Sequence, residues 1–249
     1  MYVNFLYTYT MKTSILIIAH NEEKYIADCI ASVLNQSTPA DEVVLVAHNC
    51  TDQTTAIAKR YPISIVEYAG PKGITHARIH GLKAVTGDII LCIDGDSYAQ
   101  KNWVREMTTV LKSNDNILVG SWIKFTGSLF GRISNLFNKY FCVVRNEKAA
   151  SWIWGPSFAF WGKDTAVVQQ IFEKTFSLSE ALHLSRNPDD YWLALMMQQR
   201  GNIEVIRTTF VTQHTKETTS LQALLRNREN IRNAQIMRLF AKSGALSHI

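Results

Sequence analysis

The stretch DIILCIDGD (Asp88–Asp96) decides the fold. Its five central residues are all apolar, and it ends in Asp-Gly-Asp. An apolar run without alternation is typical of a strand that is buried on both faces of a parallel sheet. Three similar runs precede it along the chain: Ser14–Ala19, Glu42–Ala47 and Ile63–Glu67. We therefore predict four buried strands in the first part of the sequence.

Segments with helical spacing separate these runs. Apolar residues recur at helical spacing over 26–34 and 73–85, and Thr51-Asp52 reads as a cap for a helix that stops at Tyr61-Pro62. Strands that alternate with helices predict an α/β fold, in which helices cover both faces of a parallel sheet. Ligands bind such sheets beyond the carboxyl ends of the strands. By this rule, we expect the ligand to lie near the three polar segments that follow predicted strands: His20–Glu23, His48–Asp52 and Asp94–Asp96.

The second half of the sequence is less regular. We expect a helix over 103–111, an aromatic loop and strand over 152–161, a helix over 189–199, a strand over 203–207 and a long basic helix over 220–242. The stretch 117–146 holds no acidic residue and mixes basic with aromatic side chains. Two alternatives stay open for it: peripheral contact with an anionic membrane, or an amphipathic helix that packs on the sheet.

Composition bounds the class of protein. The 249 residues are 47% hydrophobic and 19% charged, with a net charge of +5, as in a globular protein with a mild preference for anionic partners. The four cysteines have no C-x-x-C spacing, so we expect neither a zinc knuckle nor a disulfide framework. No apolar run reaches the about 18 residues of a membrane span, and we expect a cytoplasmic protein with residues 1–12 as a loose arm.

Asp94 and Asp96 are the first candidates for chemistry. They flank Gly95 where a buried strand meets solvent, and we expect this glycine to let phosphates approach the turn. Carboxylate oxygens at such a place suit Mn²⁺ or Mg²⁺. The alternative is an ordinary turn, because Asp and Gly are common turn residues.

Five segments together resemble the ordered motifs of family 2 glycosyltransferases. They are Ile15–Glu23, Val44–Asp52, Lys72-Gly73 with Ala77-Arg78, Ile90–Asp96 and Pro188–Asp190, and the resemblance covers about residues 13–210. It implies a single domain over 1–249 with the GT-A fold: a Rossmann-like, mostly parallel central sheet flanked by helices. Residues 13–97 would bind a nucleotide sugar, 98–215 would bind the acceptor in a less regular half, and 216–249 would form a basic helical segment.

The resemblance also implies an activity, which is metal-dependent, inverting transfer of one sugar from a nucleoside diphosphate sugar, with UDP as the expected nucleotide. The acceptor would be a hydroxyl of a glycan or a lipid-linked molecule in envelope or polysaccharide assembly, at the inner face of the cytoplasmic membrane if 117–146 binds lipid. The residues implied for the donor are Ala19, His20, Asn21, Glu22, His48, Asp52, Lys72, Gly73, Arg78, Asp94, Gly95 and Trp154. Those implied for the metal are Asp94, Asp96 and His214. The catalytic base would be Asp190, with Asp189 as the second choice.

Several of these residues have alternative roles. Glu22 and Asp52 suit helix N-termini, Asp189 and Asp190 open a predicted helix after Pro188, and Arg78 suits a solvated helix face. His214 has the alternative role of an ordinary polar residue, and Trp154 that of a core aromatic residue. The sequence also departs from the family where Ile79 replaces the usual asparagine and where Ala47-His48 replaces the usual acid.

Other classes of function fit less well. The chain contains no G-x-G and no P-loop, which argues against a dinucleotide-dependent oxidoreductase and a P-loop enzyme. Acidic clusters at the predicted pocket argue against nucleic acid as a partner. The remaining alternative is a catalytically degenerate protein of the same fold that binds a nucleotide or glycan without turnover.

Overall fold

The computed structural model describes residues 10–126, 153–184 and 187–214, together with residues 135, 232, 233, 235, 236 and 239. Its strands are β1 (Thr13–Ala19), β2 (Glu42–His48), β3 (Ser64–Tyr68), β4 (Ile89–Asp94), β5 (Ser97–Ala99), β6 (Asn116–Thr126), β7 (Ser157–Trp161) and β8 (Asn202–His214). Its α-helices are α1 (Ile26–Leu34), α2 (Thr54–Ala58), α3 (Ile74–Leu82), α4 (Trp103–Leu111), α6 (Thr165–Ala181) and α7 (Asp189–Gln198), and a short 3-10 turn, η1 (Gly162–Asp164), precedes α6.

The strands form one eight-stranded sheet in the order β3-β2-β1-β4-β7-β6-β8-β5. Strands β1 to β4 are parallel, whereas β7 runs antiparallel to both β4 and β6, and β5 runs antiparallel to β8. Strands β6 and β8 pair in parallel over most of their length, with an irregularity between Ser121 and Trp122. The prediction of a mostly parallel α/β sheet is confirmed.

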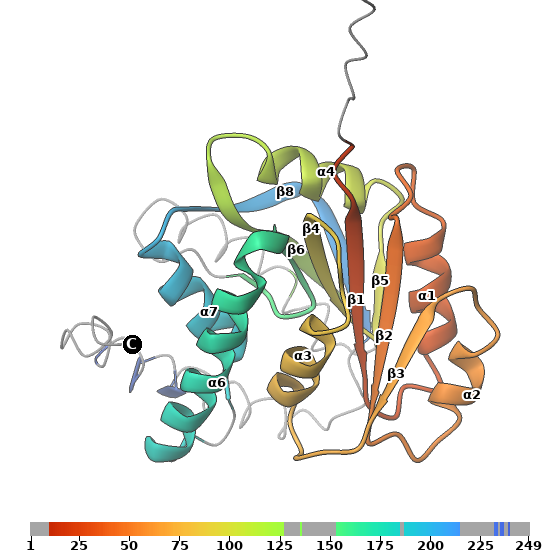
Figure 1. Ribbon diagram of the computed structural model, residues 1–249, viewed down its shortest axis with the longest axis horizontal. Helices are drawn as coiled ribbons and strands as arrows, with labels where there is room; N and C mark the ends of the chain where they lie inside the picture. Colours follow the sequence, from red (N-terminus) through yellow and green to blue (C-terminus); the bar gives the residue numbers. More distant parts are fainter. Residues whose placement is uncertain are drawn as a thin grey trace, which may run out of the picture.

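Helices cover both faces of this sheet (Figure 1). Alternate residues of β1 belong to different cores: Ile15 and Ile17 pack in the cluster with α1 and α4, whereas Leu16 and Ile18 pack in the cluster with α3, α6 and α7. Because successive side chains of a strand point to opposite faces, a strand covered on both sides must be apolar throughout. Full burial of each such side chain contributes about 1.5–3 kcal/mol.

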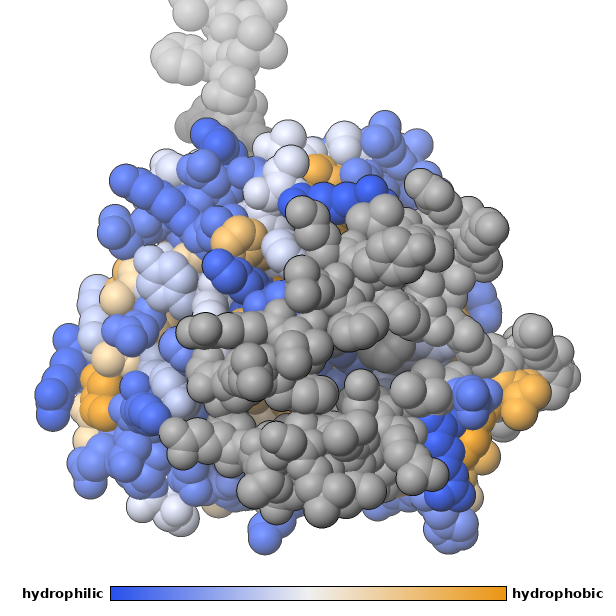
Figure 2. Space-filling view, turned by 180° about the vertical axis from the view of Figure 1, so that it is seen from behind, coloured by the Kyte–Doolittle hydropathy of each residue, from blue (hydrophilic) through white to orange (hydrophobic). Residues whose placement is uncertain are grey.

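The surface of the described residues is mostly polar. On the face shown in Figure 2, hydrophilic side chains predominate and the hydrophobic ones are scattered in small areas. The exposed large hydrophobic residues are Met11, Ile74, Tyr98 and Leu239. Within the described part of the chain, no helix is both long and apolar enough to cross a membrane.

One expectation for the second half was wrong. Residues 116–126 form strand β6, so the amphipathic-helix alternative for 117–146 fails for the first part of that stretch. The strand is favoured because Val119 and Ile123 face one core while Leu118 packs in the other. Apart from residue 135, the remainder of the stretch, which includes Cys142, lies outside the described residues, as do the N-terminal residues 1–9 and most of the predicted helix over 220–242.

Candidate functional site

The carboxyl ends of three neighbouring strands bring the predicted donor segments together. In the sheet, Ala19 of β1 pairs with Ala47 of β2, and Ile18 pairs with Asp94 of β4. The loops that follow these strands therefore leave the sheet at one edge, as expected for the ligand side of an α/β fold. This edge holds Ala19–Glu22, His48 and Asp94.

The loops after β1 and β2 are tied to each other. His20 donates from Nδ1 to the carbonyl oxygen of His48 over 2.7 Å, and the backbone N–H of Glu22 donates to Thr54 Oγ1 over 2.7 Å. The side chain of Asn21 accepts the backbone N–H of Thr51. Such contacts fix the two loops as one surface at the edge of the sheet.

Glu22 does not lie in the first turn of a helix. Helix α1 begins four residues later, at Ile26, and the carbonyl oxygen of Glu22 accepts the N–H groups of Tyr25 and Ile26. Glu22 is also largely buried, with 8% of its surface exposed. Glu22 thus stands just before the N-terminus of α1, and both interpretations, a helix-terminal acid and a contact of the nucleotide, stay predictions.

Asp52 has the capping contacts that its sequence position favours. Its carboxylate accepts the N–H of Thr54 over 2.9 Å and that of Glu23 over 3.0 Å. Burial raises the pKa of Asp52, but the hydrogen bonds from Thr54 and Glu23 outweigh it and hold this pKa below its usual value. Asp52 thus stabilises both loops, which agrees with an indirect role at the donor site.

His48 is buried, and its ring is held on two sides. Its Nε2 donates to Pro71 O over 2.9 Å, and the ring stacks at 5.3 Å on Tyr68. Burial lowers the pKa of His48, which keeps the ring uncharged at neutral pH. The bond to Pro71 also holds the start of the segment that contains Lys72 and Gly73, which are exposed immediately before α3.

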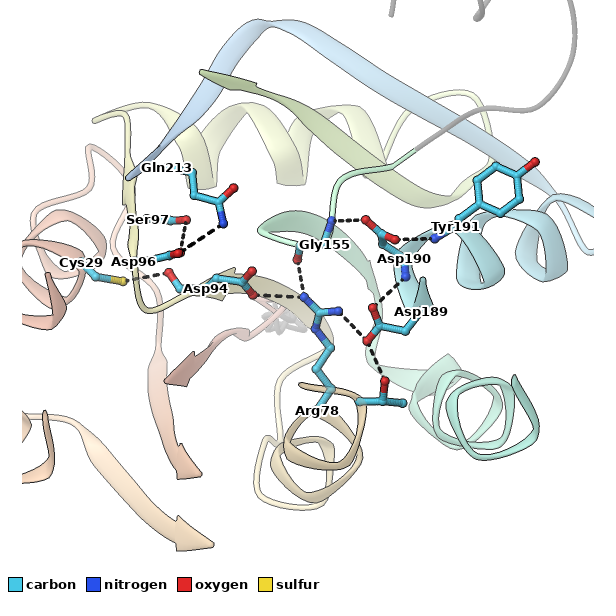
Figure 3. A network of polar contacts seen from close by, with 11 residues as sticks. Cys29, Arg78, Asp94, Asp96, Ser97, Gly155, Asp189, Asp190, Tyr191 and Gln213 are labelled. Carbon is cyan, nitrogen blue, oxygen red and sulfur yellow. Dashed lines mark hydrogen bonds and ion pairs between the residues drawn. The ribbon is translucent and has the colours of Figure 1, made fainter. Parts of the chain in front are cut away.

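Asp94 and Asp96 lie at the end of β4 (Figure 3). The Asp94 side chain is 16% exposed and accepts a hydrogen bond from Arg78 over 3.1 Å, and Asp96 accepts one from Gln213 over 3.2 Å. Burial raises the pKa of Asp94 to about 6, with the charges of Asp96 and Asp189 adding to the effect and that of Arg78 opposing it. Bringing a cation close to these carboxylates would relieve this repulsion.

Gly95 packs closely against the end of β1. A Cβ at this position would lie 3.0 Å from Ala19 Cβ and 3.2 Å from Ile18 O. The glycine N–H also donates to Ile18 O over 2.8 Å. The close approach of β1 therefore favours a residue without a side chain here, and the expectation that Gly95 also lets phosphates approach stays a prediction.

Arg78 is the centre of the site (Figure 3). Its side chain is 2% exposed, and it donates from Nη1 to Asp189 over 2.7 Å and from Nη2 to Asp94 over 3.1 Å and to Gly155 O over 2.9 Å. The alternative of a solvated helix face is wrong, because residues 77 and 78 belong to the side of α3 that faces the sheet.

The two aspartates at the start of α7 differ in their surroundings. Asp189 is buried, and besides Arg78 its carboxylate accepts a hydrogen bond from Thr75 Oγ1 over 3.2 Å. Asp190 is half-buried and accepts two backbone N–H groups, from Gly155 over 3.0 Å and from Tyr191 over 2.8 Å. Burial and the charge of Asp189 raise the pKa of Asp190 to about 6. Asp190 is thus the aspartate better suited to exchange a proton near neutral pH.

His214 lies beside Asp96 through the backbone, since its N–H donates to Asp96 O over 3.0 Å. Its ring stacks on Tyr25 at 4.5 Å and contacts Thr126 Oγ1 over 3.2 Å. In the part of the chain that the structure describes, no three His, Cys, Asp or Glu residues gather as a metal site. The role of His214 as a metal ligand stays a prediction.

Trp154 has the environment of a packed aromatic residue. It is half-buried against the first core and meets the ring of Phe125 edge-on at 6.0 Å. Its contact with a sugar stays a prediction.

Sequence reasoning missed three residues of the site. Thr75 hydrogen-bonds Asp189, the Gly155 peptide lies between Arg78 and Asp190, and Tyr25 stacks on His214. The Gly155-Pro156 pair between aromatic residues was a signal for a tight turn. Nothing local in the sequence indicates Thr75 or Tyr25, because their partners lie far away along the chain.

The arrangement gathers more negative than positive charge. Asp94, Asp189 and Asp190 surround one guanidinium, and Asp96 follows two residues after Asp94. Oxygen donors in excess of local positive charge fit a divalent cation of the Mg²⁺ or Mn²⁺ type. Asp190, on the other side of Arg78, is left as a proton acceptor.

Comparison with known proteins places the chain among sugar-transferring enzymes. Residues 14–176 match the sequence model of glycosyl transferase family 2, which is more than half of the chain. An uncharacterized glycosyltransferase, EpsJ, of Bacillus subtilis is 31% identical over 112 residues, which are 43% of this chain and 32% of that relative. The chain thus spans about a third of the length of this curated relative.

Two solved structures share the fold. Glucosyl-3-phosphoglycerate synthase from Mycobacterium tuberculosis, in complex with Mn²⁺, UDP and phosphoglyceric acid, aligns with a TM-score of 0.60 and 19% identity, over 87% of this chain and 75% of that one. Mannosyltransferase PcManGT from Pyrobaculum calidifontis, in complex with GDP-Man and Mn²⁺, aligns with a TM-score of 0.62 and 18% identity, over 85% of this chain and 59% of that one. The expected GT-A architecture is confirmed, and the chain belongs to glycosyl transferase family 2.

Proposed function

We propose that this protein transfers a single sugar from a nucleoside diphosphate sugar to a hydroxyl of a glycan or lipid-linked acceptor, with inversion and with a divalent cation. One observation carries the proposal. The Arg78 network joins the Asp94 carboxylate at the end of β4, on the side of the predicted nucleotide loops, to Asp190 at the start of α7. An acidic pair for a donor and a separate base for an acceptor are what such a displacement requires.

Asp94 and Asp96 would hold the cation, and His214 is the third candidate ligand. The excess of carboxylates over positive charge around Asp94 fits Mn²⁺ or Mg²⁺, whose remaining ligands would be diphosphate oxygens and water. When bound, the cation neutralises the charge that develops on the leaving diphosphate. The nucleotide base and ribose would lie on the surface formed by Ala19–Glu22 and His48.

Asp190 would take the proton of the acceptor hydroxyl. Its carboxylate is oriented by the N–H groups of Gly155 and Tyr191, and burial raises its pKa to about 6. This value leaves the carboxylate ionised at neutral pH and makes it a stronger base than an ordinary aspartate. Asp189, by contrast, is occupied by Arg78 and Thr75, which suits a residue that holds the site in shape.

UDP is the proposed nucleotide. The five sequence motifs support it through the family resemblance alone, because the end of β2 carries Ala47-His48 in place of the usual acid. Because one structural relative is described with UDP and another with GDP-Man, GDP is the natural comparison ligand.

The test is calorimetric titration of UDP and GDP, each with and without Mn²⁺. We expect Mn²⁺-dependent binding of UDP that is lost in Asp94→Ala/Asp96→Ala and kept in Glu173→Ala/Glu180→Ala, which removes two exposed acids of α6. UDP-sugars are then screened for consumption with and without glycan acceptors. Absence of nucleotide binding under every condition contradicts the proposal, and binding without consumption supports a catalytically degenerate protein.

A further inference from the structure

The guanidinium of Arg78 contacts both sides of the proposed reaction centre. Its Nη2 donates to Asp94 Oδ1 over 3.1 Å and also to Gly155 O over 2.9 Å, while Nη1 donates to Asp189 over 2.7 Å. One nitrogen is therefore shared between a carboxylate at the end of β4 and the loop before β7. The two N–H groups of Nη2 are fixed in the plane of the guanidinium, so a change at Asp94 that turns this plane also alters the bond to Gly155.

Gly155 passes this contact on to Asp190. Its carbonyl oxygen accepts Arg78 while its N–H donates to Asp190 Oδ2 over 3.0 Å (Figure 3). A Cβ at residue 155 would lie 2.8 Å from Arg78 Nη2, so only glycine fits against the guanidinium without displacing it. The chain Asp94–Arg78–Gly155–Asp190 is thus continuous, with each link a hydrogen bond.

We propose that Arg78 is a positioning residue that couples occupation of the donor site at Asp94 to the orientation of the base Asp190 through Gly155. The assignment rests on the proposed function for the roles of Asp94 and Asp190. It replaces the direct contact with the diphosphate that the sequence motif implied for Arg78.

The burial of Arg78 argues against that direct contact. Only 2% of the side chain is exposed, and both terminal nitrogens already have protein partners. A planar guanidinium binds several acceptors at fixed angles, whereas a lysine ammonium is a single point charge on a flexible stem. Lysine at this position would keep the positive charge and lose the simultaneous contacts.

The test compares Arg78→Lys with Arg105→Lys, which makes the same exchange on the exposed side of α4. Asp189→Asn is the second variant, for use if Arg78→Lys fails to fold. It keeps the size of the side chain and weakens the ion pair of residue 189 with Arg78 Nη1. Thermal unfolding shows whether each variant is folded. Glycine-selective ¹⁵N labelling gives few enough signals to follow, and the Gly155 amide is identified by its loss in Gly155→Ala.

The first readout is the Gly155 amide resonance. In the wild-type protein and in Arg105→Lys, we expect it to move on addition of Mg²⁺ and UDP. In Arg78→Lys this response should fall by at least about half, while the dissociation constant for Mn²⁺ and UDP changes less than about threefold, which is below 1 kcal/mol. With a consumed donor sugar in hand, kcat should fall about tenfold or more and KM should change little.

Two results overturn the proposal. One is a loss of UDP affinity in Arg78→Lys that is as large as the loss in kcat, which marks a diphosphate contact. The other is a Gly155 response as large as in Arg105→Lys. If the wild-type protein binds neither UDP nor GDP, the proposed function fails instead, and the pH titration of the Gly155 amide then tests the link to Asp190 alone. Equal titration curves for Arg78→Lys and Arg105→Lys would refute that link.

Discussion

A single buried arginine organises the candidate site at the scale of residues. The guanidinium of Arg78 pairs with Asp94 and Asp189, and it is almost fully removed from solvent. Burial disfavours the charged form of an arginine, but these two carboxylates outweigh that effect and raise its pKa, so Arg78 stays charged. Removing one partner of a buried ion pair is strongly destabilising because the other charge remains without compensation. The geometry of the carboxylates is therefore part of the stability of the fold.

Asp190→Asn should abolish most of the transfer activity. We expect kcat to fall about 10²–10⁴-fold, which is the usual contribution of a general base. In the wild-type protein, a base with a pKa of about 6 must be ionised to act, so kcat/KM, which reports the ligand-free enzyme, should fall about tenfold for each pH unit below 6 and be level above 7.

Rates of donor consumption between pH 5 and pH 8 measure this profile. Glu173→Gln makes the same carboxyl-to-amide exchange at an exposed position of α6 and should match the wild-type protein. A wild-type profile without an acid limb, or an Asp190→Asn variant with full activity, would assign the base to another group.

The sequence predicted the acidic residues of the site better than it predicted their contacts. Asp94, Asp96 and Asp190 follow from strand ends and motif order, since these are local patterns. The burial of Arg78 and the role of Gly155 were not predictable, because each depends on residues about 80 to 110 positions away along the chain.

At the scale of elements, a buried hydrogen-bond cluster joins α4 to the sheet. Trp103 at the start of α4 donates from Nε1 to Ser157 Oγ of β7 over 2.9 Å, and Ser157 Oγ also contacts Ser121 Oγ of β6 over 2.5 Å. All three side chains are buried. Helix α4 thus has a polar anchor within the apolar layer that covers this face.

Ser157→Ala should destabilise the protein by about 1–3 kcal/mol, because it leaves the Trp103 N–H and the Ser121 hydroxyl buried without this partner. Urea unfolding measures the change. Ser177→Ala, at an exposed position of α6, is the control and should change stability by less than about 0.5 kcal/mol. Equal midpoints for the two variants would mean that the cluster contributes nothing.

Gly81→Ala tests how closely α3 lies on the sheet. Alanine in place of a helical glycine normally gains about 1 kcal/mol, but a Cβ here would lie 2.6 Å from Leu16 Cδ1 and 2.8 Å from Val46 Cγ2. Overpacking of this kind costs about 1–3 kcal/mol, so we expect net destabilisation. In the background of Leu16→Val, which shortens the contacting side chain, the same exchange should be less costly. A stabilised single variant would show that α3 can move away from β1.

Elements with a regular local pattern were predicted well, and the long strands were not. Strand β8 was expected over 203–207 but extends to His214. Its second part is polar and aromatic, and it becomes a strand by pairing with β6 and with the three residues of β5. Such pairing adds tertiary hydrogen bonds that no local propensity contains.

At the scale of the whole molecule, one sheet and a helix packed on it carry the two parts of the proposed chemistry: Asp94 ends β4, and Asp190 stands at the start of α7. The alternation of strands and helices predicted the parallel part of the sheet, β1 to β4, and the edge at which ligands are expected stays a prediction. The antiparallel insertion of β7 between β4 and β6 was not predictable, since a strand's direction depends on the path of the chain. That insertion brings Gly155, just before β7, next to Arg78.

The site should lower the stability of the molecule as pH rises. Asp190 has a pKa of about 6 in the folded protein and an ordinary value of 3.8, so the folded state holds the proton more tightly than the unfolded state. For a group shifted in this direction, the contribution to the free energy of unfolding is greatest below pH 4, falls between about pH 4 and pH 6, and is constant above.

Asp190→Asn should remove the part of this pH dependence that comes from Asp190, because an amide does not ionise, while Asp94, whose pKa is also about 6, keeps its own part. The amide oxygen accepts only one of the two N–H groups now bound by Asp190, which lowers stability by an amount independent of pH. The free energy of unfolding should therefore depend on pH differently in the two proteins. From pH 4.5 to pH 7.5, the free energy of unfolding of the variant should rise by on the order of 1 kcal/mol relative to that of the wild-type protein. Urea unfolding at several pH values measures it, with Glu173→Gln as the control that should run parallel to the wild-type protein. Parallel curves for Asp190→Asn as well would mean that Asp190 titrates like an ordinary aspartate, and its assignment as the base would then lose its physical support.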